Sequence, residues 1–395
     1  MSRKGGLGAL LASLLALLLA APAAPASAPP DVDARAWALV DARTGDVLIS
    51  HGATRRLPIA STTKLMTAYV ALRELPLDRI VRAAPYDALY GESLLELRPG
   101  QRVSVRDLLY GLILRSGNDA ARDLALAAAG SEERFVDEMN RYAAALGLAD
   151  THYANPIGLD EAGNFSSARD LATLARRLLR DPAFARIAAS RSARLRSLRP
   201  PRRIETLNDL LLRVPWATGV KTGHTFGAAY VLVGSGQRKG VRLISVVIGA
   251  PTEAERDLAS LRLLEHGFSR YERRAPIRMG EELADPEVRY EDEDLPLRAA
   301  RTVSVGLRRD QRLSLAVRGP REVEGPVPRG AVLGRAIVFV DGRRAAAVPL
   351  RAARAVPEAG ALDRVRSLLG SEEIPIGIAL CVILVGAVML RHFSR

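Results

Sequence analysis

The sequence predicts a mixed α/β first domain, a small β-rich second domain and one C-terminal membrane span. A chain of 395 residues exceeds what a single hydrophobic core usually organises. Helix and strand patterns mix up to about residue 271, only short alternating stretches follow, and an uncharged apolar run lies near the C-terminus. These patterns divide the chain into a signal peptide (1–28), a first domain (31–271), a β-rich domain (272–357), a linker (358–373), a membrane span (374–390) and a tail (391–395).

The N-terminus has the layout of a secretory signal peptide. Basic Arg3 and Lys4 precede an apolar stretch, Leu7–Ala20, which is followed by small residues and prolines. The short apolar core and the run of alanines favour cleavage between Ala23 and Ala28 over an uncleaved anchor. We therefore expect export from the cytoplasm.

The first domain begins with a predicted hairpin and continues with helices. Two strands, Ala36–Asp41 and Asp46–Ser50, meet at a Thr44-Gly45 turn. Apolar residues at helical spacing predict four helices, and serine suits the N-cap position of such helices. These helices are Thr62–Arg73, Ser104–Leu114, Ser131–Leu146 and Ser167–Leu179. A strand pair, Ala229–Gly234 and Val241–Gly249, follows them.

After Arg274 the helical period disappears from the sequence. Alternating stretches separated by Gly, Pro and charged turns predict the strands of a small β-sandwich. The stretches are Thr302–Leu307, Leu313–Val317, Ala331–Val340 and Ala345–Leu350. The stretch Arg351–Ser371 has a composition typical of a linker, and we assign the linker itself to residues 358–373.

The last apolar run, Ile374–Leu390, contains no charged residue. As a helix its 17 positions would span roughly 26 Å, close to a bilayer core of about 30 Å. A buried core helix is the competing interpretation, but the position at the chain end and the basic Arg391 and Arg395 favour a single span with a cytoplasmic tail. We expect the exported domains to be anchored on the extracytoplasmic face of the cell membrane.

Composition argues against several classes of function. The net charge of +13 suits an anionic partner, yet the basic stretch from Arg191 to Arg203 lacks interleaved aromatic residues and any groove-reading motif, so we expect no nucleic acid. The single cysteine, Cys381, permits no intrachain disulfide and excludes thiol catalysis. The five histidines show no metal-ligand spacing, so we expect neither a metal nor another cofactor.

Lysine is rare in this chain. Of the 57 Lys and Arg residues four are lysines (Lys4, Lys64, Lys221 and Lys239), so the other 53 are arginines. Arginine stays protonated in proteins, whereas a partly buried lysine can lose its proton and act as a base. The lysines are therefore candidates for chemistry that arginine cannot perform.

Three short segments place hydroxyl and amine groups in a recurring order. Ser61 and Lys64 lie three residues apart at the start of a predicted helix, on one face and about a turn apart. Ser116-Gly117-Asn118 follows a predicted apolar helix, and Lys221-Thr222-Gly223 precedes a predicted strand. One Ser-x-x-Lys segment alone is common. Together the three match the SxxK, SxN and KTG motifs of serine penicillin-binding proteins and β-lactamases.

The sequence around these motifs resembles the low-molecular-mass penicillin-binding proteins of the serine-type D-alanyl-D-alanine carboxypeptidase family. The resemblance rests on residues 58–67 (PIASTTKLMT), 114–120 (LRSGNDA), 155–159 (NPIGL) and 221–225 (KTGHT). It runs from about Ala36 to Phe268 and extends more loosely to the β-rich domain and the anchor. It implies a first domain with the penicillin-binding, serine β-lactamase-like transpeptidase fold. The implied activity removes the terminal D-alanine from peptidoglycan stem pentapeptides, and β-lactam antibiotics would be covalent inhibitors.

Chemistry and the resemblance together imply roles in the reaction. Ser61 would be the nucleophile and Lys64 its base, provided that burial and a neighbouring positive charge such as Lys221 lower the pKa of Lys64. By resemblance, Ser116 would pass a proton to the leaving D-alanine nitrogen, and Asn118 would hydrogen-bond the peptide amide of the substrate.

The resemblance also implies residues that hold the substrate. Lys221 and Thr222 would recognise the terminal carboxylate, and Gly223 would let the strand approach the substrate closely. The backbone N–H groups of Ser61 and His224 would form the oxyanion hole, so the His224 side chain need not take part.

Three further positions are less specific. Arg256 matches a family arginine near the substrate carboxylate, and Glu92 and Ser93 correspond to a loop that borders the cleft, with structural roles left open for all three. Ile157 departs from the family, in which many members have His in an Asn-Pro-His-Gly motif. The hydrophobic tail also differs from the amphipathic helix of some relatives.

The same motifs leave other functions open. A DD-endopeptidase would cleave peptidoglycan cross-links with them. A β-lactamase shares them too, although the chain has no Glu-x-x-x-Asn segment suited to rapid deacylation. A non-catalytic envelope scaffold would recruit partners through the β-rich domain, and the complete set of site residues argues against it. We expect the carboxypeptidase.

Overall fold

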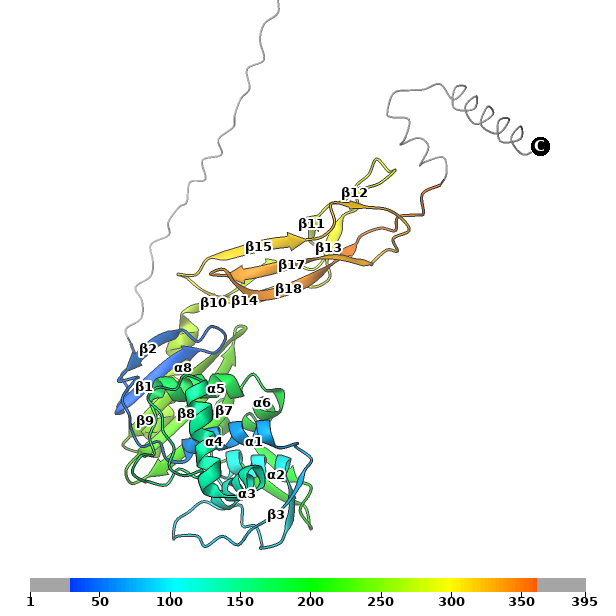
Figure 1. Cartoon of the computed structure of the whole chain (residues 1–395). Coiled ribbons are helices and arrows are strands. Elements are labelled where there is room, and N and C mark those ends of the chain that lie inside the picture. The colour runs from blue at the N-terminus through cyan, green and yellow to red at the C-terminus, as the bar shows by residue number, and fades with distance from the viewer. Residues whose placement is uncertain (1–28, 361–395) are drawn as a thin grey trace, which may run out of the picture.

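The computed structural model describes residues 29–360, which form a first domain of helices and sheet and a second domain of strands (Figure 1). The predicted signal peptide, membrane span and tail lie outside these residues, as does most of the predicted linker. Between residues 29 and 360 no helix is long and apolar enough to cross a membrane.

A five-stranded antiparallel sheet forms the centre of the first domain. Its strand order is β2-β1-β9-β8-β7, so the N-terminal hairpin pairs with the last strand of the domain. The strands are β1 (Ala36–Asp41), β2 (Val47–His51), β7 (Ala217–Thr225), β8 (Ala229–Arg238) and β9 (Val241–Ala250). The predicted hairpin and strand pair are confirmed. Strand β7 was not predicted, and the segment Lys221-Thr222-Gly223 lies inside it rather than only before a strand.

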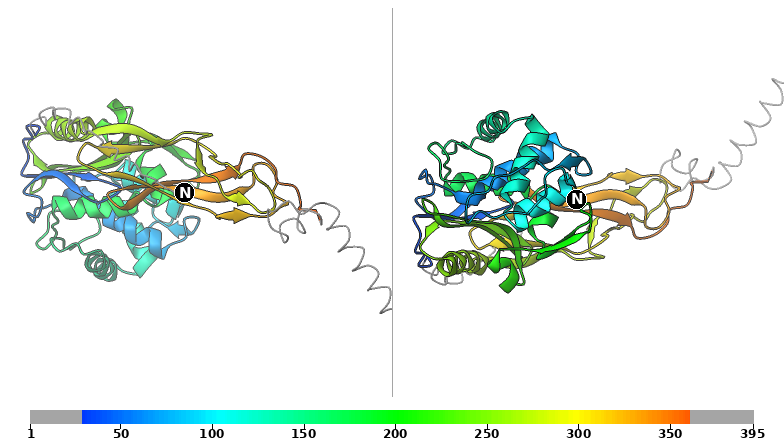
Figure 2. Two further views of the ribbon diagram at one scale, coloured as in Figure 1. Left: turned by 90° about the horizontal axis from the view of Figure 1, so that it is seen from above. Right: turned by 90° about the horizontal axis from the view of Figure 1, so that it is seen from below.

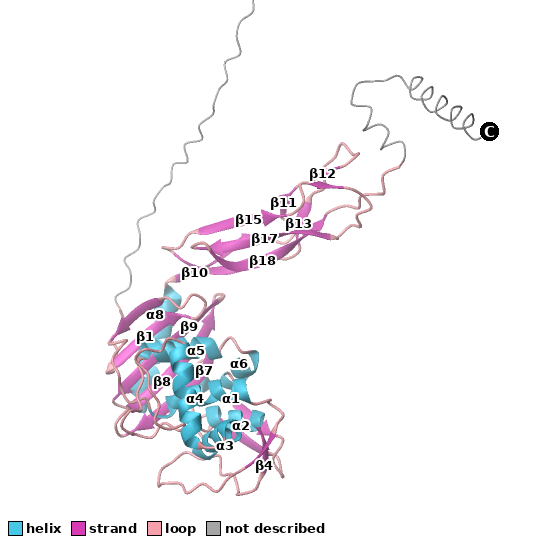
Figure 3. Ribbon diagram, in the orientation of Figure 1, coloured by secondary structure: helices cyan, strands magenta, loops and turns pink. Residues whose placement is uncertain are grey.

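Helices cover both faces of this sheet. Alternation along β1 directs Ala38 and Val40 into a core with α1 to α6, and Leu39 into a second core with α7 and α8. The helices are α1 (Lys64–Glu74), α2 (Val105–Leu114), α3 (Asn118–Ala129), α4 (Glu132–Ala145), α5 (Ala168–Leu178), α6 (Pro182–Ala188), α7 (Asp209–Arg213) and α8 (Glu253–Ser269). In the described part of the chain all helices belong to the first domain (Figure 3).

Short elements complete the first domain. A 3-10 helix, η1, leads into α1, and two small hairpins, β3–β4 and β5–β6, lie beside α2 and α3. Their bounds are η1 (Ala60–Thr63), β3 (Ile80–Arg82), β4 (Arg102–Ser104), β5 (Ser192–Leu195) and β6 (Arg202–Glu205). The loop from residue 83 to 101, which joins β3 to β4, borders the start of α3.

Side-chain capping marks the start of three of the predicted helices. The side chains of Ser104, Ser131 and Ser167 accept hydrogen bonds from backbone N–H groups three residues further on, and the predicted helices at these serines are confirmed. Helix α3 was missed. It begins four residues after α2 ends, and its N-cap, Gly117, offers no side chain.

The second domain consists of strands around an aliphatic core. A five-stranded sheet in the order β11-β13-β18-β17-β15 shares this core with the pairs β10–β14 and β12–β16. The strands are β10 (Tyr271–Ile277), β11 (Glu282–Ala284), β12 (Glu287–Val288), β13 (Leu297–Ala299), β14 (Val303–Arg308), β15 (Leu313–Arg318), β16 (Glu322–Val323), β17 (Val332–Val340) and β18 (Arg343–Ala352). The four predicted strands correspond to β14, β15, β17 and β18. The short strands are too brief for a sequence pattern.

The two domains meet where α8 passes into β10. Tyr271 donates a hydrogen bond of 2.7 Å from its hydroxyl to the buried Asp41 at the end of β1. Lys239, in the β8–β9 turn, donates to the carbonyl oxygens of Phe268 and Tyr271 at 3.4 and 3.2 Å. From this junction the second domain extends away as a narrow body (Figure 2).

Candidate active site

The Ser61 hydroxyl and the Lys64 amine meet at the start of α1. Lys64 Nζ lies 2.9 Å from Ser61 Oγ and 2.5 Å from the carbonyl oxygen of Ile157. Lys64 is fully buried, whereas Ser61 keeps partial exposure. The predicted pair is therefore in hydrogen-bonding contact, and the residue at position 157 takes part through its backbone.

Two glycines allow the chain to close around Ser61. Gly158 has φ +87°, and a Cβ there would lie 2.1 Å from the carbonyl oxygen of Ala60. A Cβ on Gly223 in β7 would lie 3.0 Å from the backbone nitrogen of Ser61. Ala60 itself has φ +47°, an uncommon conformation for a residue with a side chain. Close backbone approach thus accounts for the glycine of the KTG segment.

Burial changes the acid–base properties of Lys64. Loss of hydration is the largest cause that lowers its pKa well below the ordinary lysine value, and the positive charge of Lys221 lowers it further. The carboxylates of Glu92 and Asp119 act in the opposite direction. Lys64 can therefore lose its proton far more readily than an exposed lysine, as a base for Ser61 requires.

Ser116 and Lys221 form a second hydroxyl–amine pair. Ser116 lies between α2 and α3 with φ +60°, and Lys221 Nζ lies 3.0 Å from its Oγ. Lys221 Nζ also donates to the carbonyl oxygen of Thr222 at 2.7 Å. Burial, followed by the nearby charge of Arg256, lowers the pKa of Lys221 to about 7. Both predicted lysines thus lie buried beside a serine.

The other residues predicted to bind substrate, Thr222, His224 and Arg256, differ in their exposure to solvent and in their contacts. Thr222 is half-buried, and the exposed His224 ring stacks on Tyr230 with the ring centres 4.2 Å apart. Arg256 is 2% exposed on α8, where its guanidinium pairs with Glu253 and Asp257 at 2.9 and 2.8 Å. It acts on Lys221 through its charge, and its role toward a substrate stays a prediction.

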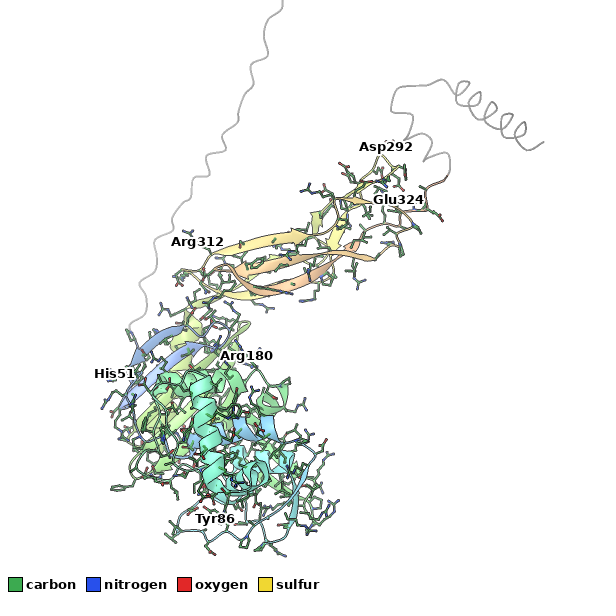
Figure 4. The ribbon with its side chains drawn as sticks, viewed as in Figure 1. His51, Tyr86, Arg180, Asp292, Arg312 and Glu324 are labelled. Carbon is green, nitrogen blue, oxygen red and sulfur yellow. The ribbon has the colours of Figure 1, made fainter. Side chains whose placement is uncertain are left out.

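Asn118 is held by the loop 83–101, which the resemblance implied to border the cleft. Its Nδ2 donates to Glu92 Oε2 at 2.6 Å, and the Tyr86 hydroxyl donates to the same oxygen at 2.5 Å. The other Glu92 oxygen accepts from the backbone N–H of Leu89 at 3.0 Å. Tyr86 lies at the end of the first domain remote from the second (Figure 4).

Sequence reasoning missed the part that α3 plays in fixing this loop. Asp119, the second residue of α3, accepts hydrogen bonds from the backbone N–H groups of Leu95 and Leu97 at 2.7 and 3.0 Å. The Asn118 N–H itself donates to the carbonyl oxygen of Ser93 at 2.8 Å. The Asp that follows Asn118 in the sequence is the one available signal, because a carboxylate in the first turn of a helix is well placed to accept backbone hydrogen bonds.

No group of three or more His, Cys, Asp or Glu residues that could hold a metal ion occurs among residues 29–360. The site is instead a serine with a buried amine, joined by a second serine–lysine pair and an oriented amide. Together with the helix–sheet–helix fold, this set defines a serine peptidase of the penicillin-binding class.

Comparison with known proteins identifies the family. The chain belongs to the Peptidase S11 family, D-alanyl-D-alanine carboxypeptidase, whose model matches residues 23–252. It is 37% identical to D-alanyl-D-alanine carboxypeptidase DacC of Escherichia coli strain K12 over 353 residues, which cover 85% of this chain and 87% of that protein. Identity to DacF of Bacillus subtilis strain 168 is 30% over 348 residues, covering 86% and 90%.

Solved structures agree with this assignment. Penicillin binding protein 6B from Escherichia coli has a TM-score of 0.60 and 30% identity, covering 82% of this chain and 97% of that one. Penicillin binding protein 5 from Haemophilus influenzae has a TM-score of 0.58 and 30% identity, covering 84% and 99%. The likeness therefore includes residues beyond the first domain. The predicted family, its fold and its serine peptidase chemistry are confirmed.

Proposed function

We propose that this chain removes the terminal D-alanine from peptidoglycan stem pentapeptides through an acyl-enzyme on Ser61. Membership of the D-alanyl-D-alanine carboxypeptidase family supports the reaction. The observation that carries the assignment of residues is the distance of 2.9 Å between Ser61 Oγ and the Nζ of the fully buried Lys64.

The proposed acylation begins with proton transfer from Ser61 to neutral Lys64. Ser61 Oγ attacks the carbonyl carbon of the penultimate D-alanine, and the oxyanion is held by the backbone N–H groups of Ser61 and His224. Ser116, hydrogen-bonded to Lys221, passes a proton to the nitrogen of the departing D-alanine, and the proton that Lys64 took from Ser61 replaces it, so that Lys64 is again neutral. The C–N bond breaks and leaves an ester on Ser61. Water then cleaves the ester, which returns the hydroxyl to Ser61 and releases the shortened peptide.

Substrate recognition in this proposal uses charge and hydrogen bonds. Lys221 and Thr222 bind the terminal carboxylate, with Arg256 adding positive potential from α8, and Asn118 binds the peptide amide. A carboxylate that approaches Lys221 stabilises its ammonium form, so substrate binding favours protonation of this residue. A β-lactam, which carries a carboxylate beside a strained amide, acylates Ser61 by the same route.

Location and domain limits are part of the proposal. Export by the N-terminal segment would bring the enzyme to the cell wall, and the segment 374–390 would anchor it on the extracytoplasmic face of the membrane. We place the boundary between the two domains between residues 271 and 272, one residue into β10, which closely follows α8.

Mass spectrometry of the purified chain tests the proposal. Incubation with penicillin should add one penicillin mass to the peptide that contains Ser61, and incubation with a D-Ala-D-Ala peptide should release D-alanine. Ser61→Ala should abolish both, whereas Ser314→Ala, an exposed serine on β15, should change neither. Absence of the adduct from wild-type protein would reject the acyl-enzyme.

Digestion of purified peptidoglycan distinguishes the carboxypeptidase from the endopeptidase and β-lactamase alternatives. Loss of pentapeptides with cross-linked dimers retained supports the proposal, while loss of dimers identifies an endopeptidase. Rapid turnover of penicillin would identify a β-lactamase.

A further inference from the structure

The carboxylate of Glu92 connects the loop 83–101 to two of the proposed site residues. It accepts hydrogen bonds from Asn118 Nδ2, from the Tyr86 hydroxyl and from the backbone N–H of Leu89. Its electrostatic effect also reaches Lys64. The proposed mechanism makes no use of this residue.

The contact with Glu92 orients the Asn118 amide. An Asn side chain can flip its oxygen and nitrogen, but a carboxylate accepts hydrogen bonds only, so the NH₂ group must face Glu92. Asn118 is 4% exposed, and its own N–H is bonded to Ser93, so the residue has little freedom to move. The amide is thereby held in one orientation before a substrate arrives.

Glu92 also opposes the two effects that lower the pKa of Lys64, which are burial and the charge of Lys221. Burial acts to raise the pKa of the Glu92 carboxyl, but hydrogen bonds from Asn118, Tyr86 and Leu89 outweigh it, so the net shift is downward and the group is ionised at neutral pH. The charged groups that act on Lys64 are Lys221 from β7, Glu92 from the loop and Asp119 from α3. Glu92 is the stronger of the two that favour the ammonium form of Lys64.

We propose that Glu92 is a positioning residue of this site: its carboxylate holds the Asn118 amide in the orientation that the substrate needs, and the same negative charge acts on the Lys64 amine. The proposal rests on the proposed function, in which Asn118 binds the substrate and Lys64 activates Ser61. Glu92 lies on a loop outside the three motifs. Its negative charge acts on Lys64, and the length of its side chain decides the contact with Asn118.

Two substitutions of Glu92 separate the effect of its charge from the effect of its side-chain length. Glu92→Gln removes the charge but keeps one acceptor oxygen. Glu92→Asp keeps the charge but shortens the side chain by one methylene, which weakens the contact with Asn118. Glu96→Gln is the matched control, because Glu96 lies on the same loop with its side chain 82% exposed and 3.9 Å from Arg202. Thermal melting checks that each variant is folded.

The first measurement is the second-order rate of acylation by labelled penicillin as a function of pH. Without the negative charge, Lys64 loses its proton more readily, so the acid limb of Glu92→Gln should move to lower pH by roughly half a unit or more. The limb of Glu92→Asp should stay near that of wild type. For a D-Ala-D-Ala peptide, KM should rise several-fold in Glu92→Asp, in which the contact with Asn118 is weakened, and less in Glu92→Gln, which keeps an acceptor oxygen for Asn118. Glu96→Gln should match wild type. An unshifted limb in folded Glu92→Gln overturns the electrostatic role, and an unchanged KM in folded Glu92→Asp overturns the role in positioning.

The second measurement does not depend on activity. The chain has four lysines, so NMR of the full chain with isotope-labelled lysine gives few signals, which Lys64→Arg and Lys239→Arg variants assign. The titration of Lys64 should move to lower pH in Glu92→Gln and remain in place in Glu96→Gln. If wild type shows no acylation, the proposed function fails, while a shifted Lys64 titration still supports the electrostatic role of Glu92. If wild type is active and Lys64 titrates identically in both variants, the electrostatic role of Glu92 fails while the proposed function stands.

Discussion

The two domains differ in how many polar side chains they bury. Among residues 29–360, buried polar and charged side chains lie almost entirely in the first domain, where Lys64, Lys221 and Arg256 are nearly inaccessible to solvent. In the second domain Gln311 is the exception, and the core there is made of Val, Leu, Ile and Ala alone. Burial of a charge destabilises a fold, whereas burial of aliphatic groups stabilises it.

The second domain is therefore packed as stability requires, whereas part of the first domain is packed as catalysis requires. The second domain follows the ordinary rule of apolar inside and charged outside. The first domain departs from that rule around Ser61, where low hydration lowers the pKa values of two lysines. Such buried charged groups are expected at functional sites, because catalysis often needs a side chain whose pKa differs from its value in water. Substitutions in the two regions should therefore affect different properties.

The largest expected effect is loss of acylation in Lys64→Arg. Arginine keeps its proton, so Ser61 would lose its base, and the rate of penicillin acylation should fall by roughly 10²- to 10⁴-fold. Lys239→Arg, an exposed lysine in the β8–β9 turn, is the control and should acylate at the wild-type rate. Acylation of Lys64→Arg at a rate near that of wild type would show that another group acts as the base.

In the second domain a core substitution should lower stability and leave acylation unchanged. Leu350 in β18 is fully buried, and Leu350→Ala should lower the free energy of unfolding of that domain by about 2 to 5 kcal/mol. Leu313→Ala, at a side chain 36% exposed on the edge strand β15, should cost much less. The acylation rate of both should equal that of wild type. A matching loss of acylation in Leu350→Ala would mean that the second domain supports the site.

A smaller effect on stability is expected from Gly158→Ala, which tests the close approach beneath Ser61. The added Cβ would lie 2.1 Å from the Ala60 carbonyl oxygen, so the backbone must shift. Gly130→Ala is a matched control, because Gly130 has φ +81° but nothing within 4 Å of its Cβ position. We expect Gly158→Ala to be less stable than the control by roughly 1 to 3 kcal/mol and to acylate more slowly. Equal melting temperatures for the two variants would contradict the proposed clash.

The most gradual expected effect is the pH dependence of stability that comes from Lys221, which is small per pH unit. Its pKa is about 7 in the folded protein and near 10.5 when exposed, so the unfolded chain binds more protons between these values. Stability should therefore rise with pH across this window, by roughly 1 kcal/mol per pH unit relative to Lys221→Met. Denaturant unfolding of both proteins at pH 7, 8.5 and 10 measures the difference. Parallel curves would show that Lys221 has an ordinary pKa.

Much of the fold and of the site could be predicted from local patterns. The hairpin of β1 and β2 shows as alternation, and α2, α4 and α5 show as helical periods that begin at a capping serine. Helix α3 could not be predicted in this way, because Gly117 provides no cap and the preceding Ser116 has a positive φ. The short strands of the second domain depend on pairing across the sheet, which leaves little trace in a few residues.

The kind of chemistry follows from the sequence, because a hydroxyl and an amine one helical turn apart, with the SxN and KTG segments in order, are sufficient to specify it. The rarity of lysine further marked Lys64 and Lys221. The acid–base behaviour of these groups depends on how the chain folds. Burial and the mutual repulsion of cations lower their pKa values, and these depend on elements brought together from distant parts of the chain. The contact between Glu92 and Asn118 likewise exists because a loop folds back onto α3, which no spacing along the sequence encodes.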